Sequence, residues 1–444
     1  MAPLPGKNAS FLGALLLLAG WSGALEVPLK FRPTSANSQD WVGEDAHRLV
    51  CWAQPPPGNW KLPRFHAPAP VFSVIYLGGI RHLLVLDKKN PRNPFYNRLF
   101  FDAGGDGDLT DDPVVEGKAF SRGLGFYYAT FPPLEVKLRL PQGTAPYRFE
   151  IRAHKRAPLM GRSPSRVRAA ENVAIFMLTA CEYTGTLRVG SRSYHLALAD
   201  SNGNGIFGDR LEKEEEGSSR QEAAQKSDRL FLGSGPNFSP QEDLRAWGLL
   251  SLEGILYKMR FDQPRGRLLL DPIPTPAGRL SFPTRAAKIK LLGLEGAPDI
   301  LFVQPAREVR VPKGIYKLGC YALTARDDGG NIWTLKAQAP AGAPPARAGG
   351  EKPEMVLFGP PYTPVVHVRA RFPRRLRRRT VTAHLEFGVR GTGGEEVFFL
   401  ASPTNRPSSI LRSKKLPDLP KEPAFTILEL PGETPVASGK FEYG

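Results

Sequence analysis

The sequence has few cysteines, and this scarcity excludes one class of exported scaffold. Only Cys51, Cys181 and Cys320 occur among its 444 residues, whereas small secreted domains that rely on disulfides are rich in cysteine. Three cysteines allow at most one internal bridge and leave one thiol over. Their spacings are too wide for a zinc knuckle. We therefore expect buried free cysteines.

Familiar catalytic motifs are also missing from the sequence. It has no His-Glu-x-x-His zinc motif, no Gly-x-Ser-x-Gly nucleophile elbow and no phosphate-binding P-loop. Its seven histidines are scattered along the chain. No enzyme class is indicated, so a hydrolase would have to assemble its site from residues far apart in the sequence.

Long apolar runs are absent except near the N-terminus. Residues 1–24 contain one charge, Lys7, then the apolar stretch Phe11–Ala19, then the small residues Ser22 and Ala24. These parts in this order are typical of a secretory signal, although a buried N-terminal helix is the alternative. The apolar stretch is too short to cross a bilayer, which takes about 20 residues. We expect a bacterial protein that is secreted or periplasmic, with no transmembrane segment after signal removal.

Acidic residues are outnumbered, since the chain has 60 Lys and Arg against 43 Asp and Glu. A basic exported protein attracts acidic polymers and anionic surfaces, so an acidic glycan or the cell-envelope surface is the expected partner. The run Arg374–Arg379 is either a docking patch or the solvated end of a hairpin. No aromatic residue interleaves with these arginines, as a nucleic-acid groove would require, so no nucleic acid is expected.

Glycine and proline are abundant, with 45 and 44 residues, which favours short strands joined by tight turns. Alternating apolar and polar residues predict many strands, including Val71–Leu77, Leu134–Leu140 and Val365–Arg371. Helix candidates are few, namely residues 210–227 and 240–250. The sequence therefore predicts a mainly β fold.

A faint internal repeat is present in the first two thirds of the chain. The segments "YLGGIRHLLVLD" and "YNRLFFD" correspond to "LRVGSRSYHLALAD" and "SDRLFLG". Each pair has a glycine turn, a strand that ends in aspartate, and a later strand with Arg-Leu-Phe. Two related β units would explain this pattern, and chance similarity among short apolar strands is the alternative. We expect two N-terminal β domains, over residues 25–155 and 156–280.

The pattern changes after about residue 281. The segment "VRVPKGIYKLGCYAL" predicts a strand, a Pro-Lys-Gly turn and a long second strand, and it resembles turns of transthyretin-like modules. Residues 338–353, "QAPAGAPPARAGGEKP", are rich in proline and glycine and predict a loop or linker. We expect residues 281–444 to form a C-terminal β-sandwich of the immunoglobulin or transthyretin type with this insertion.

The most distinctive chemical signal is the segment "FFDAGGDGDLTDDP". Like charges this close repel one another unless a cation or water lies between them, and intervening glycines let the chain fold around a central point. Calcium prefers six to eight oxygen ligands from such a flexible loop. Leu109 is placed to anchor the loop in the core. The candidate metal ligands are Asp102, Asp106, Asp108, Asp111 and Asp112.

A second segment, "LADSNGNGIFGDR", has oxygen-bearing side chains at alternate positions, followed by glycine. Phe207 takes the apolar eighth position of the loop. The candidate ligands are Asp200, Asn202, Asn204, the backbone carbonyl of Ile206, and Asp209.

Both segments resemble EF-hand and dockerin-type calcium loops over about ten residues each, as in uncharacterised secreted β-rich bacterial proteins. They depart from the full pattern at position three of the first loop, Gly104, and at position twelve, which is Pro113 or Leu211 rather than glutamate. The alternative is a turn whose Asp and Asn side chains bond their own backbone. The resemblance implies a calcium-stabilised extracytoplasmic structural or binding protein. A secreted hydrolase acting on polysaccharide or peptide is the alternative function.

Overall fold

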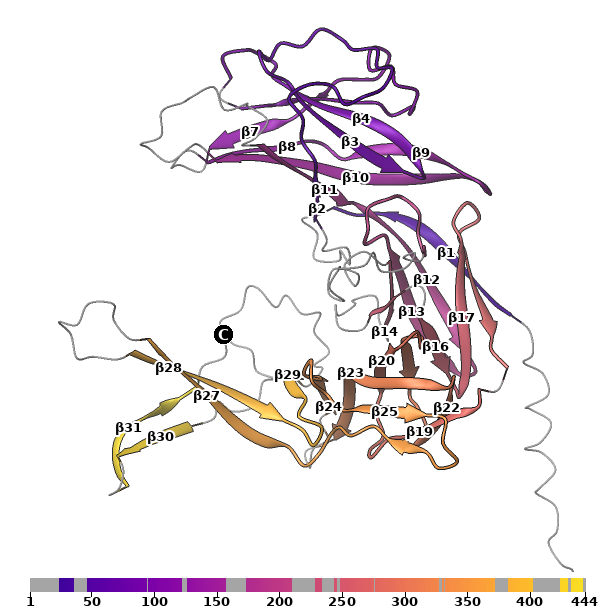
Figure 1. The fold of residues 1–444 in the computed structure, drawn as a ribbon, viewed down its shortest axis with the longest axis vertical. Coiled ribbons are helices and arrows are strands. Elements are labelled where there is room, and N and C mark those ends of the chain that lie inside the picture. The colour runs from indigo at the N-terminus through magenta and orange to yellow at the C-terminus, as the bar shows by residue number, and fades with distance from the viewer. Residues whose placement is uncertain are drawn as a thin grey trace, which may run out of the picture. The chain divides into compact units, whose positions relative to one another are not determined.

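The computed structural model describes residues 24–35, 46–93, 95–121, 126–156, 173–209, 228–233, 243–245, 248–274, 276–326, 330, 332–371, 382–401, 424–429 and 433–441. These segments form strands joined by turns, and none of them contains a helix. This confirms the predicted mainly β fold (Figure 1). The chain forms two compact units: unit 1 comprises residues up to 247 together with 258–272, and unit 2 comprises 248–257 and residues from 273 onward.

The described strands of unit 1 lie in two complete sheets and in part of a third. One sheet has the order β3 (Val71–Leu77), β4 (Ile80–Asp87), β5 (Arg98–Phe101), β6 (Val115–Glu116). A second has the order β2 (Ala46–Leu49), β11 (Val173–Thr179), β10 (Gly143–Arg156), β8 (Phe126–Thr130), β7 (Lys118–Ser121), and β9 (Leu134–Leu140) also pairs with β10. The third has the order β15 (Asp243–Arg245), β14 (Arg229–Gly233), β13 (Arg192–Ala199), β12 (Cys181–Val189), β1 (Leu25–Pro33), β18 (Arg267–Pro272), β17 (Ile255–Asp262).

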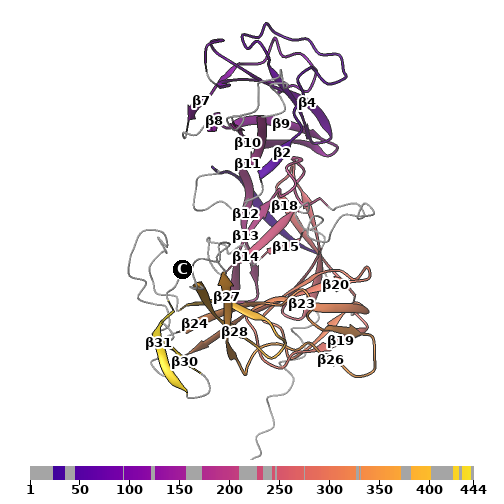
Figure 2. The same ribbon diagram turned by 60° about the vertical axis from the view of Figure 1, so that its left-hand side comes forward.

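Unit 2 has a large sheet with the order β16 (Leu249–Leu252), β21 (Ile300–Val303), β20 (Lys288–Leu294), β23 (Gly314–Arg326), β24 (Ile332–Gln338), β29 (Glu396–Ala401), β28 (Thr382–Arg390), β27 (Thr363–Arg371), and β25 (Pro345–Ala348) also pairs with β23. A smaller sheet contains β22 (Glu308–Val311), β19 (Gly278–Ser281) and β26 (Glu354–Met355), and β30 (Ala424–Glu429) pairs with β31 (Thr434–Lys440) (Figure 2). Leu280 and Val311 of the smaller sheet share one buried cluster with Ile289 and Leu318 of the larger sheet. The larger sheet and the β22–β19–β26 sheet of unit 2 therefore enclose a common apolar core.

The alternating sequence of β9 shows how these strands form. In Leu134–Leu140 the residues Leu134, Val136 and Leu138 are buried while Glu135 and Lys137 are exposed. Side chains of successive strand residues point to opposite faces of a sheet. One face of β9 therefore joins the core and the other meets solvent, as its period of two predicts.

The structure groups the first two expected domains differently. Residue 155 lies inside β10, which pairs with β11 on one side and with β8 and β9 on the other. Segments 25–155 and 156–247 therefore belong to one unit. The two Arg-Leu-Phe runs do begin β5 and β14, the second strands of the pairs β4–β5 and β13–β14.

Two local expectations are wrong. Residues 240–250 were expected to form a helix, but β15 and β16 occupy residues 243–245 and 249–252. The proline-rich insertion 338–353 contains β25, whose Ala346 and Ala348 are buried in the core of unit 2. Proline is tolerated in a short strand that pairs along one edge, so composition alone did not exclude β structure here.

The cysteine prediction is confirmed in part, because Cys51, Cys181 and Cys320 form no disulfide with one another and Cys181 is buried, whereas Cys51 and Cys320 are only partly buried. The predicted signal segment apart from Ala24, the helix candidate 210–227 and the run Arg374–Arg379 lie outside the described residues.

Candidate functional site

The first aspartate-rich segment, residues 102–112 (loop 1), leaves the end of β5 and wraps around the buried side chain of Asp102. One carboxylate oxygen of Asp102 accepts the N–H groups of Gly105 at 2.7 Å and Asp106 at 3.2 Å. The other oxygen accepts the N–H of Gly107 at 3.1 Å. The carboxylate thus satisfies three backbone donors that a tight turn would otherwise leave without partners.

Leu109 anchors loop 1 in the core. It packs in a buried cluster with Phe72, Leu83, Val85 and Phe100. Burial of an apolar side chain of this size stabilises the fold by roughly 1.5–3 kcal/mol. The expectation that Leu109 anchors the loop is confirmed.

Lys61 closes the outer side of loop 1. Its N–H bonds to the carbonyl of Gly107, its carbonyl accepts the N–H of Leu109 at 3.0 Å, and its Nζ donates to Asp108 at 2.6 Å. Hydrogen bonds from Lys61 and Thr110 lower the pKa of Asp108 to about 2. The Asp108 carboxylate is therefore paired with a lysine, and only its backbone carbonyl resembles the usual seventh ligand of a calcium loop.

The second segment, residues 200–209 (loop 2), leaves β13 and has the same internal bonding. The buried carboxylate of Asp200 accepts the N–H groups of Gly203 at 2.6 Å and Gly205 at 2.8 Å. Phe207, at the position of Leu109, is 2% exposed and contacts the rings of Tyr147 and Tyr183. Each loop is thus held by a buried aspartate at its first position and an apolar anchor at its eighth.

The glycines explain why both loops adopt one backbone path. The fourth and sixth residues, Gly105 and Gly107 in loop 1 and Gly203 and Gly205 in loop 2, all have φ between 68° and 85°. Residues with a Cβ atom rarely adopt this left-handed region. Glycine at the sixth position, after oxygen-bearing residues, is also the turn signal of an EF-hand loop.

The centre of loop 2 is closed by its own side chains. Asn202 and Asn204 donate their amide hydrogens to the two carboxylate oxygens of Asp209, over 2.7 and 2.5 Å. Their own oxygens accept the N–H groups of Asn204 and Ile206. Both oxygens of Asp209 thus accept hydrogen bonds from amides, whereas in loop 1 the Asp108 carboxylate is paired with a lysine.

Two residues distant in sequence brace loop 2. Asp228 accepts the N–H groups of Ser201 at 3.0 Å and Gly208 at 2.6 Å. The Gln263 amide accepts the N–H of Phe207 and donates to the carbonyl of Gly205. Sequence reasoning missed both residues, and no local pattern around either of them marks this role.

The electrostatics of the two loops reflect crowded carboxylates. Burial raises the pKa of Asp112 in loop 1 to about 6, and neighbouring carboxylates, chiefly Asp102, add to the rise. In loop 2, burial raises the pKa values of Asp200 and Asp228, and the charge of Asp209 contributes to both. A nearby cation would relieve these unfavourable charges.

A histidine lies against each loop. His82, which is 4% exposed, bonds through Nδ1 to the backbone carbonyl of Asp102 at 2.7 Å. A Cβ atom on Gly105 would lie 3.1 Å from the His82 ring, and one on Gly203 would lie 2.5 Å from the ring of His47. The absence of a side chain at the fourth loop position therefore makes room for an imidazole in both cases.

The predicted ligands converge only in part. Within the described ranges, no group of three or more His, Cys, Asp or Glu side chains is arranged to hold a metal ion. Asp102 and Asp112 both bond to loop 1 backbone, Asp112 accepting the N–H of Ala103 at 3.2 Å, while Asp106 and Asp111 are exposed. A calcium ion would need backbone or amide oxygens in addition to these carboxylates.

Comparison of the chain with protein-family models, with curated proteins and with solved structures found no match. In the part of the chain that the structure describes, no helix has the length and apolar character needed to cross a membrane.

Proposed function

We propose that this chain is an exported bacterial protein that is stabilised by calcium and binds an anionic glycan outside the cytoplasm. The observation that carries the proposal is the shared construction of loops 1 and 2. In both, a buried aspartate organises a glycine turn that resembles an EF-hand or dockerin-type loop. The excess of basic residues, 60 Lys and Arg against 43 Asp and Glu, supports an anionic partner.

Loop 1 is the proposed principal calcium site. The carboxylates of Asp102, Asp106, Asp111 and Asp112 and the carbonyl of Asp108 would supply its oxygens. The raised pKa of Asp112 shows that its negative charge is unfavourable where it lies. A calcium ion would neutralise the cluster and tie the end of β5 to the segment that follows it.

Loop 2 is proposed as a weaker site built on the same backbone. Asn202 and Asn204 would have to turn their oxygens inward and release Asp209, to which they now donate. The Ile206 carbonyl and Asp200 would complete the ligand set. Breaking two hydrogen bonds to a carboxylate opposes binding, so loop 1 should fill first.

We further propose that unit 2 is a sandwich of the immunoglobulin or transthyretin type. The support is that its two sheets bury Leu280, Val311, Ile289 and Leu318 in one cluster. Two sheets packed face to face over a shared core are the architecture of such domains.

The unfolding midpoint of the full chain tests the calcium proposal. With a dissociation constant of ~0.1 mM and ~1 mM calcium, binding adds about 1.4 kcal/mol to the free energy of unfolding. For a unit of this size we expect the midpoint to rise by about 3–6 °C over that in chelator. Magnesium at the same concentration controls for general ionic effects. Identical midpoints in calcium and chelator would remove calcium from the proposal.

A further inference from the structure

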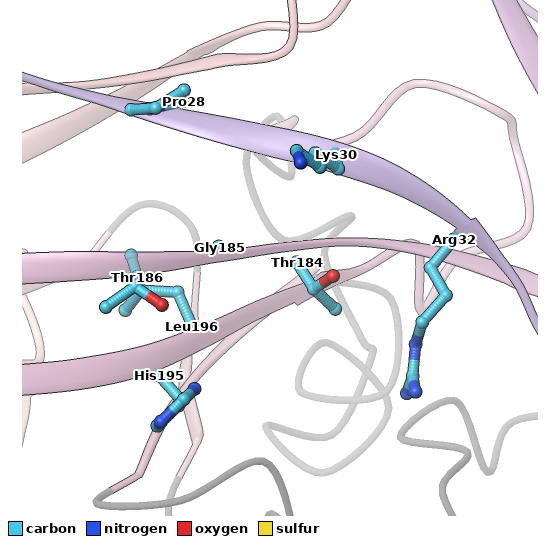
Figure 3. A pocket seen from close by; sticks show the side chains of 8 residues that line it. All are labelled: Pro28, Lys30, Arg32, Thr184, Gly185, Thr186, His195 and Leu196. Carbon is cyan, nitrogen blue, oxygen red and sulfur yellow. The ribbon is translucent and has the colours of Figure 1, made fainter.

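A hollow of about 450 Å³ lies on one face of the third sheet of unit 1, over β1, β12 and β13 (Figure 3). Its volume falls within the range of small-molecule sites, roughly 300–1,000 Å³. The residues that line it are Pro28, Lys30, Arg32, Thr184, Gly185, Thr186, His195 and Leu196.

Strand register gathers the polar side chains of the hollow on one face. Lys30 is paired with Thr184 across β1 and β12, and Thr186 is paired with His195 across β12 and β13. Directly opposed residues point to the same side with Cβ atoms roughly 5 Å apart. The alternate residues of these strands, such as Leu29 and Tyr183, are buried in the core. The polar groups are therefore neighbours on a surface that the core holds fixed.

The positive charges are concentrated at the β1 side of the hollow. Arg32 donates through Nε to the buried carboxylate of Glu182 at 2.6 Å, which fixes the guanidinium in place. Lys30 is exposed and forms no ion pair or hydrogen bond with any described residue. Because Glu182 balances Arg32, Lys30 provides the net charge of the hollow.

The remaining hydrogen-bonding groups lie toward β13. The hydroxyls of Thr184 and Thr186 and the ring of His195 have no hydrogen-bond partner among the described residues. A ligand that pairs with all of these side chains must present an anionic group to Lys30 and several hydroxyl groups to Thr184, Thr186 and His195. A sugar that carries a carboxylate or sulfate has this chemistry.

We propose that this hollow binds one acidic sugar unit of a polyanionic glycan, with its anionic group on Lys30 and its hydroxyls on Thr184, Thr186 and His195. The inference rests on the proposed glycan-binding function and assigns its site. One unpaired lysine beside hydroxyl and imidazole groups distinguishes such a site from a general basic surface, on which every lysine would contribute equally.

Calorimetric titration of the full chain with polygalacturonate, dextran sulfate and neutral dextran tests the site. The first two probes distinguish carboxylate from sulfate as the preferred anion. We expect Lys30→Gln to weaken binding of the preferred polymer about tenfold, the usual effect of losing a charged hydrogen bond. The nearly isosteric Thr186→Val removes a hydroxyl without changing charge, and we expect a loss of about fivefold.

Lys137→Gln is the matched control, since Lys137 is an exposed lysine of β9 in the same unit. It removes the same charge elsewhere and should leave affinity within about twofold. Equal losses from Lys30→Gln and Lys137→Gln, or no effect of Thr186→Val, would overturn the site while leaving glycan binding intact. A wild-type chain that binds neither polyanion better than dextran would instead refute the proposed function. Unchanged unfolding midpoints show that each variant is folded.

Discussion

Asp102→Asn tests whether one carboxylate organises loop 1. The change keeps the size and shape of a side chain that is fully buried. One oxygen of Asp102 accepts the N–H groups of Gly105 and Asp106, and the other accepts the N–H of Gly107. Asparagine retains a single acceptor oxygen, so its amide group would face the N–H of Gly107, donor against donor.

The cost follows from these three contacts. A buried N–H of Gly107 without an acceptor costs about 1–3 kcal/mol, and loss of charge weakens the two remaining bonds by about 1 kcal/mol in total. Relief of repulsion between Asp102 and Asp112 returns about 0.5 kcal/mol, since Asp112 is partly solvated. The net loss of about 2.5 kcal/mol, the middle of the resulting range, corresponds to a fall of about 5–10 °C in the midpoint of a unit this size.

Differential scanning calorimetry of the full chain in chelator measures this loss without a contribution from calcium. Asp111→Asn is the control, because Asp111 is exposed and has no hydrogen bond or ion pair within the described residues. The unfolding midpoint of Asp111→Asn in chelator should stay within about 2 °C of the wild-type midpoint. If Asp102→Asn melts as close to wild type as the control does, the carboxylate does not organise the loop.

Two further predictions concern pH and glycine. The pKa of Asp112 is raised to about 6 in the folded chain, against an ordinary value of 3.8. Between these pH values the folded state binds more protons than the unfolded state. In the presence of chelator, the protein therefore loses stability as the pH rises from about 4 to about 6. Calcium should oppose this loss by stabilising the charged form of Asp112. Its effect on the unfolding midpoint should therefore be large at pH 7.5 and small at pH 5. Equal effects at the two pH values would contradict the assignment of Asp112 as a calcium ligand. Gly203→Ala, with φ of 71° and a Cβ placed 2.5 Å from His47, should cost more than about 2 kcal/mol in chemical denaturation. Gly79→Ala has φ of 82° and open space around its Cβ, so only the backbone cost of about 1 kcal/mol remains; equal losses would show that the contact with His47 is unimportant.

Local patterns in the sequence predicted the elements that depend on local chemistry. Val71–Leu77 and Leu134–Leu140 form strands with the predicted bounds, because alternation of apolar and polar residues reports directly on a sheet with one buried face. The loop anchors Leu109 and Phe207 were also predictable, since each is the apolar residue at the eighth position of its loop. Both are buried.

The features that depend on distant residues were not predictable. Asp228 and Gln263 lie 27 and 56 residues from their partners in loop 2, so only the pairing of β13 with β14 and the path of β17 bring them there. The expected domain boundary at residue 155 failed for the same reason, because the two sides of β10 pair with strands from both expected domains. Sequence composition carries no information about such pairings.

The different surroundings of the two loops account for their different chemistry. Loop 2 lies inside unit 1, where Asp228, Gln263 and the N–H of Gly78 all bond to it. A charge in such a place is costly unless it is hydrogen-bonded, and the Asn202 and Asn204 amides donate to the Asp209 carboxylate. Loop 1 is braced on its outer side by Lys61 and exposes Asp106 and Asp111, so exchangeable ions reach it. If loop 1 is the principal calcium site, as we propose, calcium should stabilise the exposed loop 1 more than the enclosed loop 2.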